Sequence, residues 1–283
     1  MIVFKPRQVF KPHPVLGWSL APGAQIEVPF RNNIIQTIGS DGWRVTPGQT
    51  EAAEFNFAVY GCSFTYGTGL ADSETFAALL QNSLKNVNVL NRGVGGHGTV
   101  QSFLQFRQDV KKGVVQAAVF GVISDHRFRN IAHPQRMRHF LKMDWYERGV
   151  EHFPIAKQDR NGKLEIDYVA IWQPSILRHD FDVFLPNDYM LDQATFSVFK
   201  AITEFSELHG IPVIIALLDQ LDPEFNIAML SGFSNAIDVS APWDKSHTFL
   251  PKDIHPNAYA NRLFSERLLV PVKGLCESVE RKI

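Results

Sequence analysis

The sequence has few cysteines and no long apolar segment. Its two cysteines, Cys62 and Cys276, have neither the spacing of a zinc site nor that of a disulfide framework. No stretch approaches the roughly 18 consecutive apolar residues of a membrane-spanning helix, and the first residues lack the apolar core of a signal peptide. These absences predict a protein without a membrane span and favour a cytoplasmic location, although a chain trimmed of its leader would look the same.

An excess of charge of either sign is also absent. The 283 residues include 28 Lys and Arg and 29 Asp and Glu, for a formal net charge of −1, and no basic run. Nucleic-acid binding requires a concentrated basic surface, so we expect no nucleic-acid partner. With 45% hydrophobic and 20% charged residues, the chain has enough apolar material for one large α/β domain. A charge near zero leaves the oligomeric state open.

Apolar runs alternate with helical patterns from about residue 55 onward. Each run is apolar enough to be buried on both faces, as strands of a parallel sheet are. The predicted strands are Phe57–Tyr60, Val87–Leu90, Ala117–Ile123, Pro212–Leu218 and Ala236–Val239. The predicted helices are Ser73–Leu84, Thr99–Val110, Gln193–His209 and Asn257–Leu269. This alternation predicts a flavodoxin-like three-layer α/β/α domain with about five parallel strands.

Two regions depart from the alternation. Residues 1–50 are rich in proline, glycine and short β-like runs, which predict an N-terminal β extension ahead of a catalytic domain over residues 51–283. An insertion at about 129–192 follows the third strand, and the pair Asn161–Gly162 between two alternating runs predicts a β-hairpin. Because this insertion leaves the sheet where ligands bind, we expect it to act as a lid.

The insertion is also rich in aromatic side chains. These residues are Trp145, Tyr146, Phe153, Tyr168 and Trp172. They could stack on a sugar or hold an acyl chain. The simpler interpretation, which we prefer, is that they form the insertion's own small core.

A serine and a histidine occupy two strand-end loops far apart in the chain. Segment 57–67, FAVYGCSFTYG, places Ser63 where a parallel sheet presents its ligand-binding edge, although a lone serine there more often caps a helix. Segment 253–257, DIHPN, places Asp253 two residues before His255. A serine hydroxyl needs a histidine base that is oriented by a third group. We therefore predict Ser63 as nucleophile, His255 as general base and acid, and Asp253 as its orienting carboxylate.

A glycine-rich loop follows the second predicted strand. Segment 91–99 reads NRGVGGHGT, and its glycines let backbone amides approach a developing oxyanion. We predict that the amides of Ser63 and Gly96 stabilise this charge. After the third strand, Ser124 and His126 are further candidate donors, because either side chain can donate a hydrogen bond.

Other polar residues near these loops have competing interpretations. Arg129 is a candidate for binding a substrate carboxylate or phosphate. His97 is a candidate substrate contact or else a surface loop residue. His247, with Asp244 nearby, competes with His255 as base. The histidines from 126 to 139 lack the spacing of metal ligands, so we predict no metal and no organic cofactor.

The quoted segments resemble the sequence blocks of the SGNH (GDSL-type) hydrolases. Segment 61–67 is similar to the first block, with Cys62 where the family commonly has aspartate. Asn91, Gly93 and Gly96 resemble the second block, and segment 253–257 the last. The resemblance covers about residues 55–270. It implies a serine esterase that cleaves a short acyl ester, such as an O-acetyl group on a carbohydrate, through an acyl-enzyme.

Two departures from the family pattern keep alternatives open. The third block usually reads Gly-x-Asn-Asp, whereas segment 121–127 here is GVISDHR and has no asparagine. The last block has Asp-x-His, with Lys252 at the position of the commoner aspartate. That spacing resembles a branch that includes alginate-type polysaccharide O-acetyltransferases. The alternatives are an O-acyltransferase with the same triad and a catalytically silent binding protein.

Overall fold

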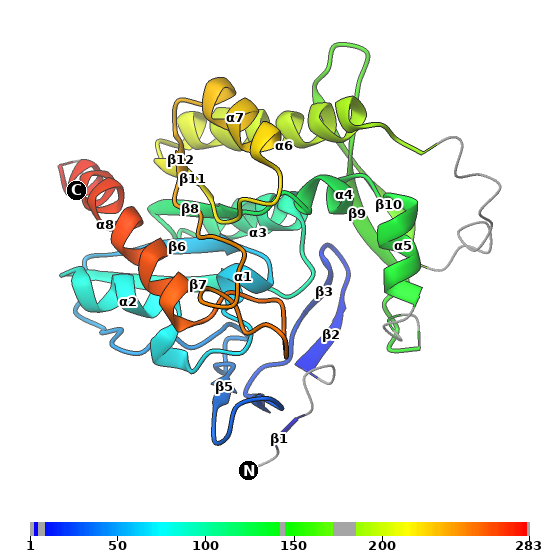
Figure 1. Ribbon diagram of the computed structural model, residues 1–283. Coiled ribbons are helices and arrows are strands. Elements are labelled where there is room, and N and C mark those ends of the chain that lie inside the picture. Colours follow the sequence, from blue (N-terminus) through cyan, green and yellow to red (C-terminus); the bar gives the residue numbers. More distant parts are fainter. Residues whose placement is uncertain (1–2, 5–8, 142–144, 146, 172–184, 282–283) are drawn as a thin grey trace.

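A parallel sheet forms the centre of the computed structural model, which describes residues 3–4, 9–141, 145, 147–171 and 185–281 (Figure 1). Its five strands lie in the order β12-β11-β8-β6-β7, and all their pairings are parallel. In chain order they are β6 (Phe55–Gly61), β7 (Val87–Gly93), β8 (Ala117–Val122), β11 (Val213–Leu217) and β12 (Ala236–Asp238). The predicted flavodoxin-like three-layer α/β/α architecture is confirmed.

Different helices cover the two faces of the sheet (Figure 1). One face packs on α2 (Phe76–Ser83) and α8 (Ala258–Glu280). The other packs on α3 (Thr99–Lys111), α6 (Asp188–His209) and α7 (Pro223–Gly232). The side chains of β6 alternate between the two cores, because successive residues of a strand point to opposite faces. A strand buried on both faces must be apolar throughout, which is why the sequence predicted it so readily.

Helix α8 continues past the end predicted at Leu269. Pro271 lies inside it and removes one backbone donor. The residues beyond this proline keep the helical apolar spacing, and Val272, Cys276 and Val279 are buried in the core against the sheet. This burial outweighs the local cost of the proline, so tertiary packing extends the helix.

The N-terminal extension and the insertion consist of small sheets beside the central domain. The extension has a three-stranded sheet and a hairpin, formed by β1 (Val3–Phe4), β4 (Gln25–Glu27) and β5 (Ile35–Thr37), and by β2 (Phe10–His13) and β3 (Gly17–Leu20). The insertion has α4 (His126–Asn130), α5 (Pro134–Leu141), β9 (His152–Gln158) and β10 (Leu164–Ala170). Strands β9 and β10 pair antiparallel around the Asn-Gly turn, which confirms the predicted hairpin.

The extension and the insertion share one hydrophobic core. Trp18 of β3 packs on Trp145 and Phe153 of the insertion, with ring centroids 4.7 and 6.4 Å apart. This cluster also includes Val94 of the glycine loop and Tyr66, which is three residues after the predicted nucleophile Ser63. Trp145 and Phe153 are therefore core residues, as the simpler interpretation held, but their core is shared with the extension. Tyr168 is exposed, and Tyr146 and Trp172 lie outside the described residues.

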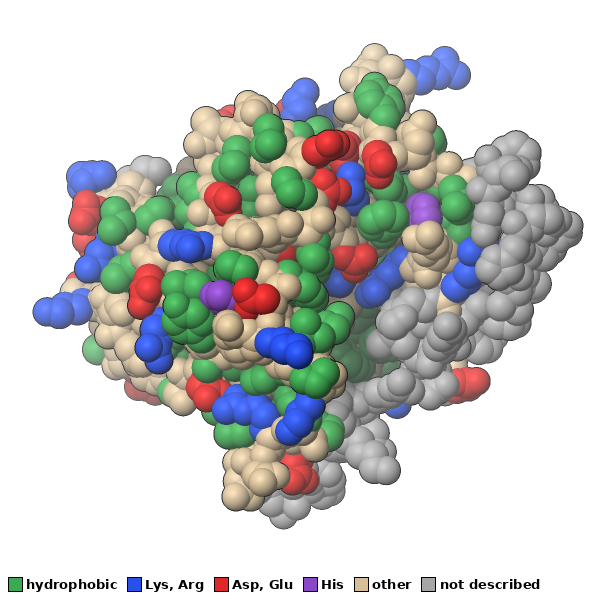
Figure 2. All heavy atoms as spheres, viewed as in Figure 1, with side chains coloured by type: hydrophobic (Ala, Val, Ile, Leu, Met, Phe, Trp, Pro, Cys, Tyr) green, Lys and Arg blue, Asp and Glu red, His purple; other side chains and the backbone are tan. Residues whose placement is uncertain are grey.

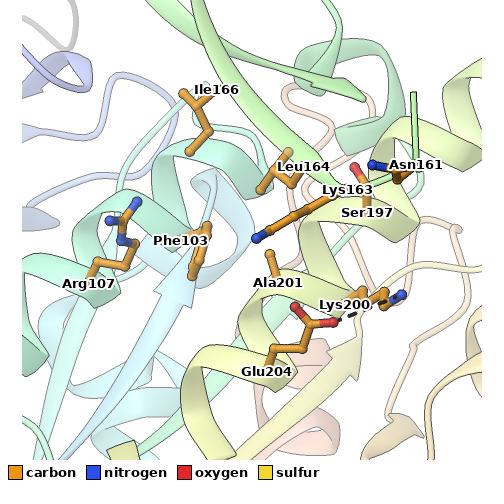
Figure 3. Close-up of a pocket in the computed structure, with 11 residues that line it drawn as sticks. Phe103, Arg107, Asn161, Lys163, Leu164, Ile166, Ser197, Lys200, Ala201 and Glu204 are labelled. Atoms are coloured by element: carbon orange, nitrogen blue, oxygen red, sulfur yellow. Dashed lines mark ion pairs between the residues drawn. The ribbon is translucent and has the colours of Figure 1, made fainter. Parts of the chain in front are cut away.

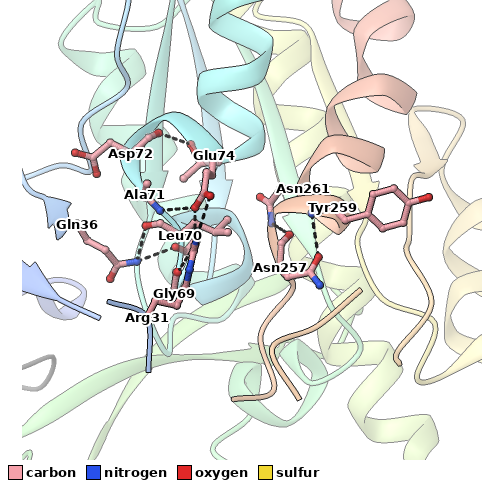
Figure 4. Close-up of polar contacts among 12 residues, drawn as sticks. Arg31, Gln36, Gly69, Leu70, Ala71, Asp72, Glu74, Asn257, Tyr259 and Asn261 are labelled. Carbon is pink, nitrogen blue, oxygen red and sulfur yellow. Dashed lines mark hydrogen bonds and ion pairs between the residues drawn. The ribbon is translucent and has the colours of Figure 1, made fainter. Parts of the chain in front are cut away.

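Polar contacts tie the extension to the loop that follows Ser63 and its short helix (Figure 4). The Arg31 guanidinium pairs with both carboxylate oxygens of Glu74, at 2.6 and 3.0 Å, and donates to the carbonyl of Gly69. The side-chain amide of Gln36 donates from Nε2 to the carbonyls of Gly67 and Leu70, at 2.9 and 3.2 Å. The extension is thus bonded to the loop over residues 67–74.

Acidic and basic side chains are intermixed over the face seen in Figure 2, in keeping with the near-zero net charge. Among the residues that the structure describes, no helix has the length and apolar character needed to cross a bilayer.

Candidate active site

Ser63 is the first residue of the short helix α1 (Ser63–Tyr66), which begins directly after β6 and Cys62. Because the first amides of a helix have no intrahelical acceptor, the Ser63 N–H is open to another partner. The hydroxyl of Ser63 makes no hydrogen bond to any residue the structure describes. Cys62 is fully buried. The nucleophile predicted from the sequence therefore lies at a strand end with its hydroxyl uncommitted.

Glycines on the neighbouring strands let α1 lie close against the sheet edge. A Cβ added at Gly93, at the end of β7, would lie 2.3 Å from the backbone nitrogen of Tyr66. One added at Gly121, near the end of β8, would lie 2.4 Å from Thr65 Oγ1. Contacts this short do not occur between real atoms. A side chain at Gly93 would therefore displace the backbone of α1, and one at Gly121 would displace the Thr65 side chain.

Asp253 and His255 form a hydrogen-bonded pair in the loop before α8. His255 Nδ1 lies 2.6 Å from Asp253 Oδ1, and the same oxygen accepts from the His255 amide at 2.8 Å. Burial by itself disfavours the charged carboxylate, but the hydrogen bonds and charge of His255 prevail and lower the pKa of Asp253. The His255 ring meets the ring of Phe64 edge-on at 5.8 Å between centroids. Phe64 follows Ser63, so the structure brings the predicted base to the helix of the predicted nucleophile.

A second histidine–aspartate pair lies in the same loop. His247 Nδ1 is 2.7 Å from Asp244 Oδ1, but its ring packs on Tyr259 of α8. Within the described part of the chain no ring contact joins His247 to α1. Of these two histidines, His255 is the one whose ring contacts a residue of α1 in the described part of the chain.

The glycine loop after β7 is held to α1 and keeps an amide open. Asn91 accepts from the Gly93 amide at 3.0 Å and donates to the Thr65 carbonyl at 3.0 Å, so one side chain joins the two segments. The Gly96 N–H has no acceptor among the described residues. The amides of Ser63 and Gly96, predicted as oxyanion donors, are therefore both available to a ligand.

Ser124 is committed to a partner that the sequence analysis missed. Its amide donates to both carboxylate oxygens of Asp219, at 3.2 and 3.1 Å, and its hydroxyl donates to the second at 3.1 Å. Neither group of Ser124 is therefore free for an oxyanion, contrary to the expected role. Asp219 follows β11, so it too lies at a strand's carboxyl end, and that position is the signal that could have identified it.

His126 is buried beside two arginines. Burial, followed by the charges of Arg129 and Arg136, lowers the pKa of His126 well below its ordinary value, so the ring is neutral at neutral pH. Its Nδ1 lies 3.3 Å from Thr99 Oγ1, and its Nε2 has no hydrogen-bond partner among the described residues. His126 thus keeps one ring nitrogen available, and its role as a donor stays a prediction.

His97 and Arg129 are internal rather than open to substrate. His97 is 2% exposed, its Nε2 lies 3.0 Å from the Trp18 carbonyl, and burial lowers the pKa of His97 to about 3. Arg129 donates to the carboxylate of Asp125 at 2.7 Å and to the His97 carbonyl at 2.8 Å. Both side chains brace the loops around the site, so the expected substrate contacts find no support in their placement.

The described cavities lie away from Ser63 and His255. The one in Figure 3, with a volume of about 420 Å³, lies between α3, α6 and the turn of the β9–β10 hairpin. Its charged residues are Arg107, Lys163, Lys200 and Glu204, all exposed, and the last two form an ion pair at 4.0 Å. Gln158 ties the hairpin to α6 through the Gln193 carbonyl. Residues 172–184 of the insertion lie outside the described part, so its function as a lid stays a prediction.

Comparisons with known proteins find structural matches only. No family profile matches the chain, and no curated protein matches its sequence. TesA is 14% identical, with 78% of this chain and 99% of that one covered and a TM-score of 0.44. A member of the lipolytic protein G-D-S-L family from Veillonella parvula DSM 2008 is 13% identical, with coverages of 76% and 97% and a TM-score of 0.33.

A catalytic mutant of Axe2, an acetylxylan esterase from Geobacillus stearothermophilus, is 10% identical, with coverages of 79% and 96% and a TM-score of 0.41. These matches include the G-D-S-L family that the sequence blocks resemble. At such identities and TM-scores they assign no activity to this chain.

Proposed function

We propose that this protein is a serine ester hydrolase in which Ser63, His255 and Asp253 act together. The observation that carries the proposal is the Asp253–His255 pair, joined at 2.6 Å and seated against Phe64, the residue after Ser63. A carboxylate on Nδ1 leaves the other ring nitrogen, Nε2, to accept a proton. The amides of Ser63 and Gly96, which have no acceptor among the described residues, would supply the site for the oxyanion.

The reaction follows from these groups. His255 Nε2 takes the proton of the Ser63 hydroxyl as the oxygen attacks the ester carbonyl. The amides of Ser63 and Gly96 stabilise the tetrahedral oxyanion. Collapse of this intermediate breaks the ester bond, and the imidazolium returns its proton to the departing alcohol. Water then attacks the acyl-enzyme by the same route and releases the acid and free Ser63.

For the substrate we propose a short acyl ester, with an O-acetyl group on a carbohydrate as the class to test first. The support for this choice is that the Asp253-x-His255 block resembles the last block of a branch that includes alginate-type polysaccharide O-acetyltransferases. The same resemblance motivates an acyltransferase as the second candidate, in which a sugar hydroxyl replaces water as acyl acceptor.

The test combines a fluorophosphonate, which labels activated serines, with p-nitrophenyl acetate turnover. We expect one adduct, confined to Ser63, and its loss in Ser63→Ala together with at least about a 10⁴-fold fall in turnover. Unchanged thermal stability of the variant would show that the fold is intact. Retained turnover in Ser63→Ala would refute the assignment.

The two histidine–aspartate pairs supply a matched control. His255→Gln should abolish turnover, because the base is lost. His247→Gln removes an equivalent pair, which has no ring contact with α1 among the described residues, and should leave most of the turnover intact. Loss of activity in both variants or in His247→Gln alone would contradict the choice of base. Labelling with slow turnover that a sugar acceptor accelerates would indicate the acyltransferase, and absence of labelling would indicate a binding protein.

A further inference from the structure

Trp18 of the N-terminal extension is bonded directly to the glycine loop of the candidate active site. Its side chain is completely buried, and its indole Nε1 donates to the Gly95 carbonyl at 2.9 Å, across 77 residues of sequence. Its own carbonyl lies 3.0 Å from His97 Nε2. Gly96 lies between Gly95 and His97 and has a φ of +82°. A Cβ added at Gly96 would lie 3.2 Å from Trp18 Cζ2. Trp18 thus contacts three consecutive residues of the loop.

The hydrogen bond from Trp18 fixes the orientation of the Gly95 carbonyl and, with it, that of the Gly96 N–H. The Gly95 carbonyl and the Gly96 N–H belong to one peptide unit, which is planar and trans. In a trans peptide the C=O and the N–H point in opposite directions. A bond that fixes the Gly95 oxygen on the side of Trp18 therefore turns the Gly96 N–H to the opposite side, away from the extension.

We propose that Trp18 is a positioning residue for oxyanion stabilisation, and that it acts through the Gly95–Gly96 peptide. The inference rests on the proposed function, in which the Gly96 amide is one of two oxyanion donors. Trp18 does not touch the substrate. It holds the donor in the orientation that the tetrahedral intermediate requires, so that no reorganisation of the loop is needed during the reaction.

The bond from Trp18 acts on a different peptide from the other bonds that hold this loop. Arg129 and Arg136 donate to the carbonyls of His97 and Gly96, whereas the indole of Trp18 donates to that of Gly95. Glycine has the largest choice of backbone conformations, so loss of the indole bond should let the Gly95–Gly96 peptide sample other orientations. The indole bond is buried, where hydrogen bonds are strong and polarise the peptide that they engage. Donation to the Gly95 oxygen makes the Gly96 N–H a better donor, because the two groups share one amide.

Trp145 offers a matched control in the same aromatic cluster. Its ring stacks on Trp18 with centroids 4.7 Å apart, and it is 3% exposed. Its Nε1 has no hydrogen-bond partner among the described residues. Trp18→Phe and Trp145→Phe thus remove similar volumes from one cluster, but only the first removes a bond to the glycine loop.

The experiment measures kcat/KM for p-nitrophenyl acetate per active site, with active sites counted by fluorophosphonate adduct mass. It also measures inhibition by a boronic acid, which forms a tetrahedral adduct whose oxygen occupies the oxyanion site. We expect Trp18→Phe to lower kcat/KM by about 10- to 100-fold and to weaken boronic acid binding in proportion. Trp145→Phe should change neither quantity by as much as about threefold.

A merely structural role of Trp18 predicts a different pattern. It would lower the number of labelled sites but leave kcat/KM per site and boronic acid binding unchanged, and this result would overturn the proposal. If Trp18→Phe fails to fold, 3-benzothienylalanine at position 18 keeps the ring shape and removes only the N–H. Full activity of this isostere would equally overturn the proposal.

The outcomes also separate this inference from the function on which it rests. Labelled, active wild-type protein with an unimpaired Trp18→Phe variant refutes the role of Trp18 alone. Wild-type protein that the fluorophosphonate does not label refutes the esterase, and the role of Trp18 with it.

Discussion

Asp219 holds the loop after β8 by accepting both the amide and the hydroxyl of Ser124. Burial raises the pKa of Asp219 to about 6; the Ser124 hydrogen bonds oppose this rise, and the charges of Asp125 and Asp222 add to it. The folded protein therefore binds a proton at Asp219 more tightly than the unfolded chain does. Stability from this group is complete at acidic pH and declines as pH rises through about 6.

The pH dependence of unfolding tests this account. As pH rises from about 4.5 to about 7.5, wild-type protein should lose about 2 kcal/mol of unfolding free energy relative to Asp219→Asn, in which the group cannot ionise. Urea denaturation of both proteins at the two pH values measures the difference. A difference that does not change with pH would show that Asp219 titrates normally in the folded protein.

At the scale of the element, α1 is positioned by the strand ends beneath it. Gly93 and Gly121 leave the space in which Thr65 and Tyr66 lie, and the Asn91 side chain bonds α1 to the glycine loop. A helix of four residues has too few internal hydrogen bonds to be stable alone. Its orientation, and hence that of Ser63, depends on these contacts.

Gly93→Ala should therefore destabilise the protein by about 3 kcal/mol and displace Ser63, because the new methyl group would overlap the Tyr66 backbone. Gly274→Ala is the control, since Gly274 lies inside α8 with open space around its Cα, and we expect a gain of about 0.5 to 1 kcal/mol. Chemical denaturation gives both values. Equal stability of wild type and Gly93→Ala would contradict the close approach of α1.

For the whole molecule, the N-terminal extension shares its core with the candidate site. Trp18 and Ile26 of the extension belong to the same hydrophobic cluster as Tyr66, Val94 and Phe153. Arg31 bonds the extension to Glu74 on the central domain. Because the extension buries its apolar side chains in a core shared with the rest of the chain, it should not unfold separately.

We therefore predict one cooperative unfolding transition for the whole chain. Scanning calorimetry should give one peak whose calorimetric and van't Hoff enthalpies agree. Limited proteolysis should not release residues 1–50 before the rest unfolds, because their detachment would expose the shared cluster. Two separated transitions, with the first confined to the extension, would contradict this prediction.

The sequence alone determined the architecture and identified the candidate site residues, because both depend on local patterns. Doubly buried strands are apolar throughout, an Asn-Gly pair predicts a tight turn, and strand ends of a parallel sheet share one edge. These patterns identified the five strands, the β9–β10 hairpin, Ser63 and the Asp253–His255 pair.

Tertiary structure decided which residues meet across the chain. Asp219 is 95 residues from Ser124, and Trp18 is 77 residues from Gly95. The choice of His255 over His247 depends on which of two similar pairs contacts Phe64. The burial of His97 likewise depends on the extension that covers it. No local pattern encodes such contacts, because they arise only when the separate elements pack into one core.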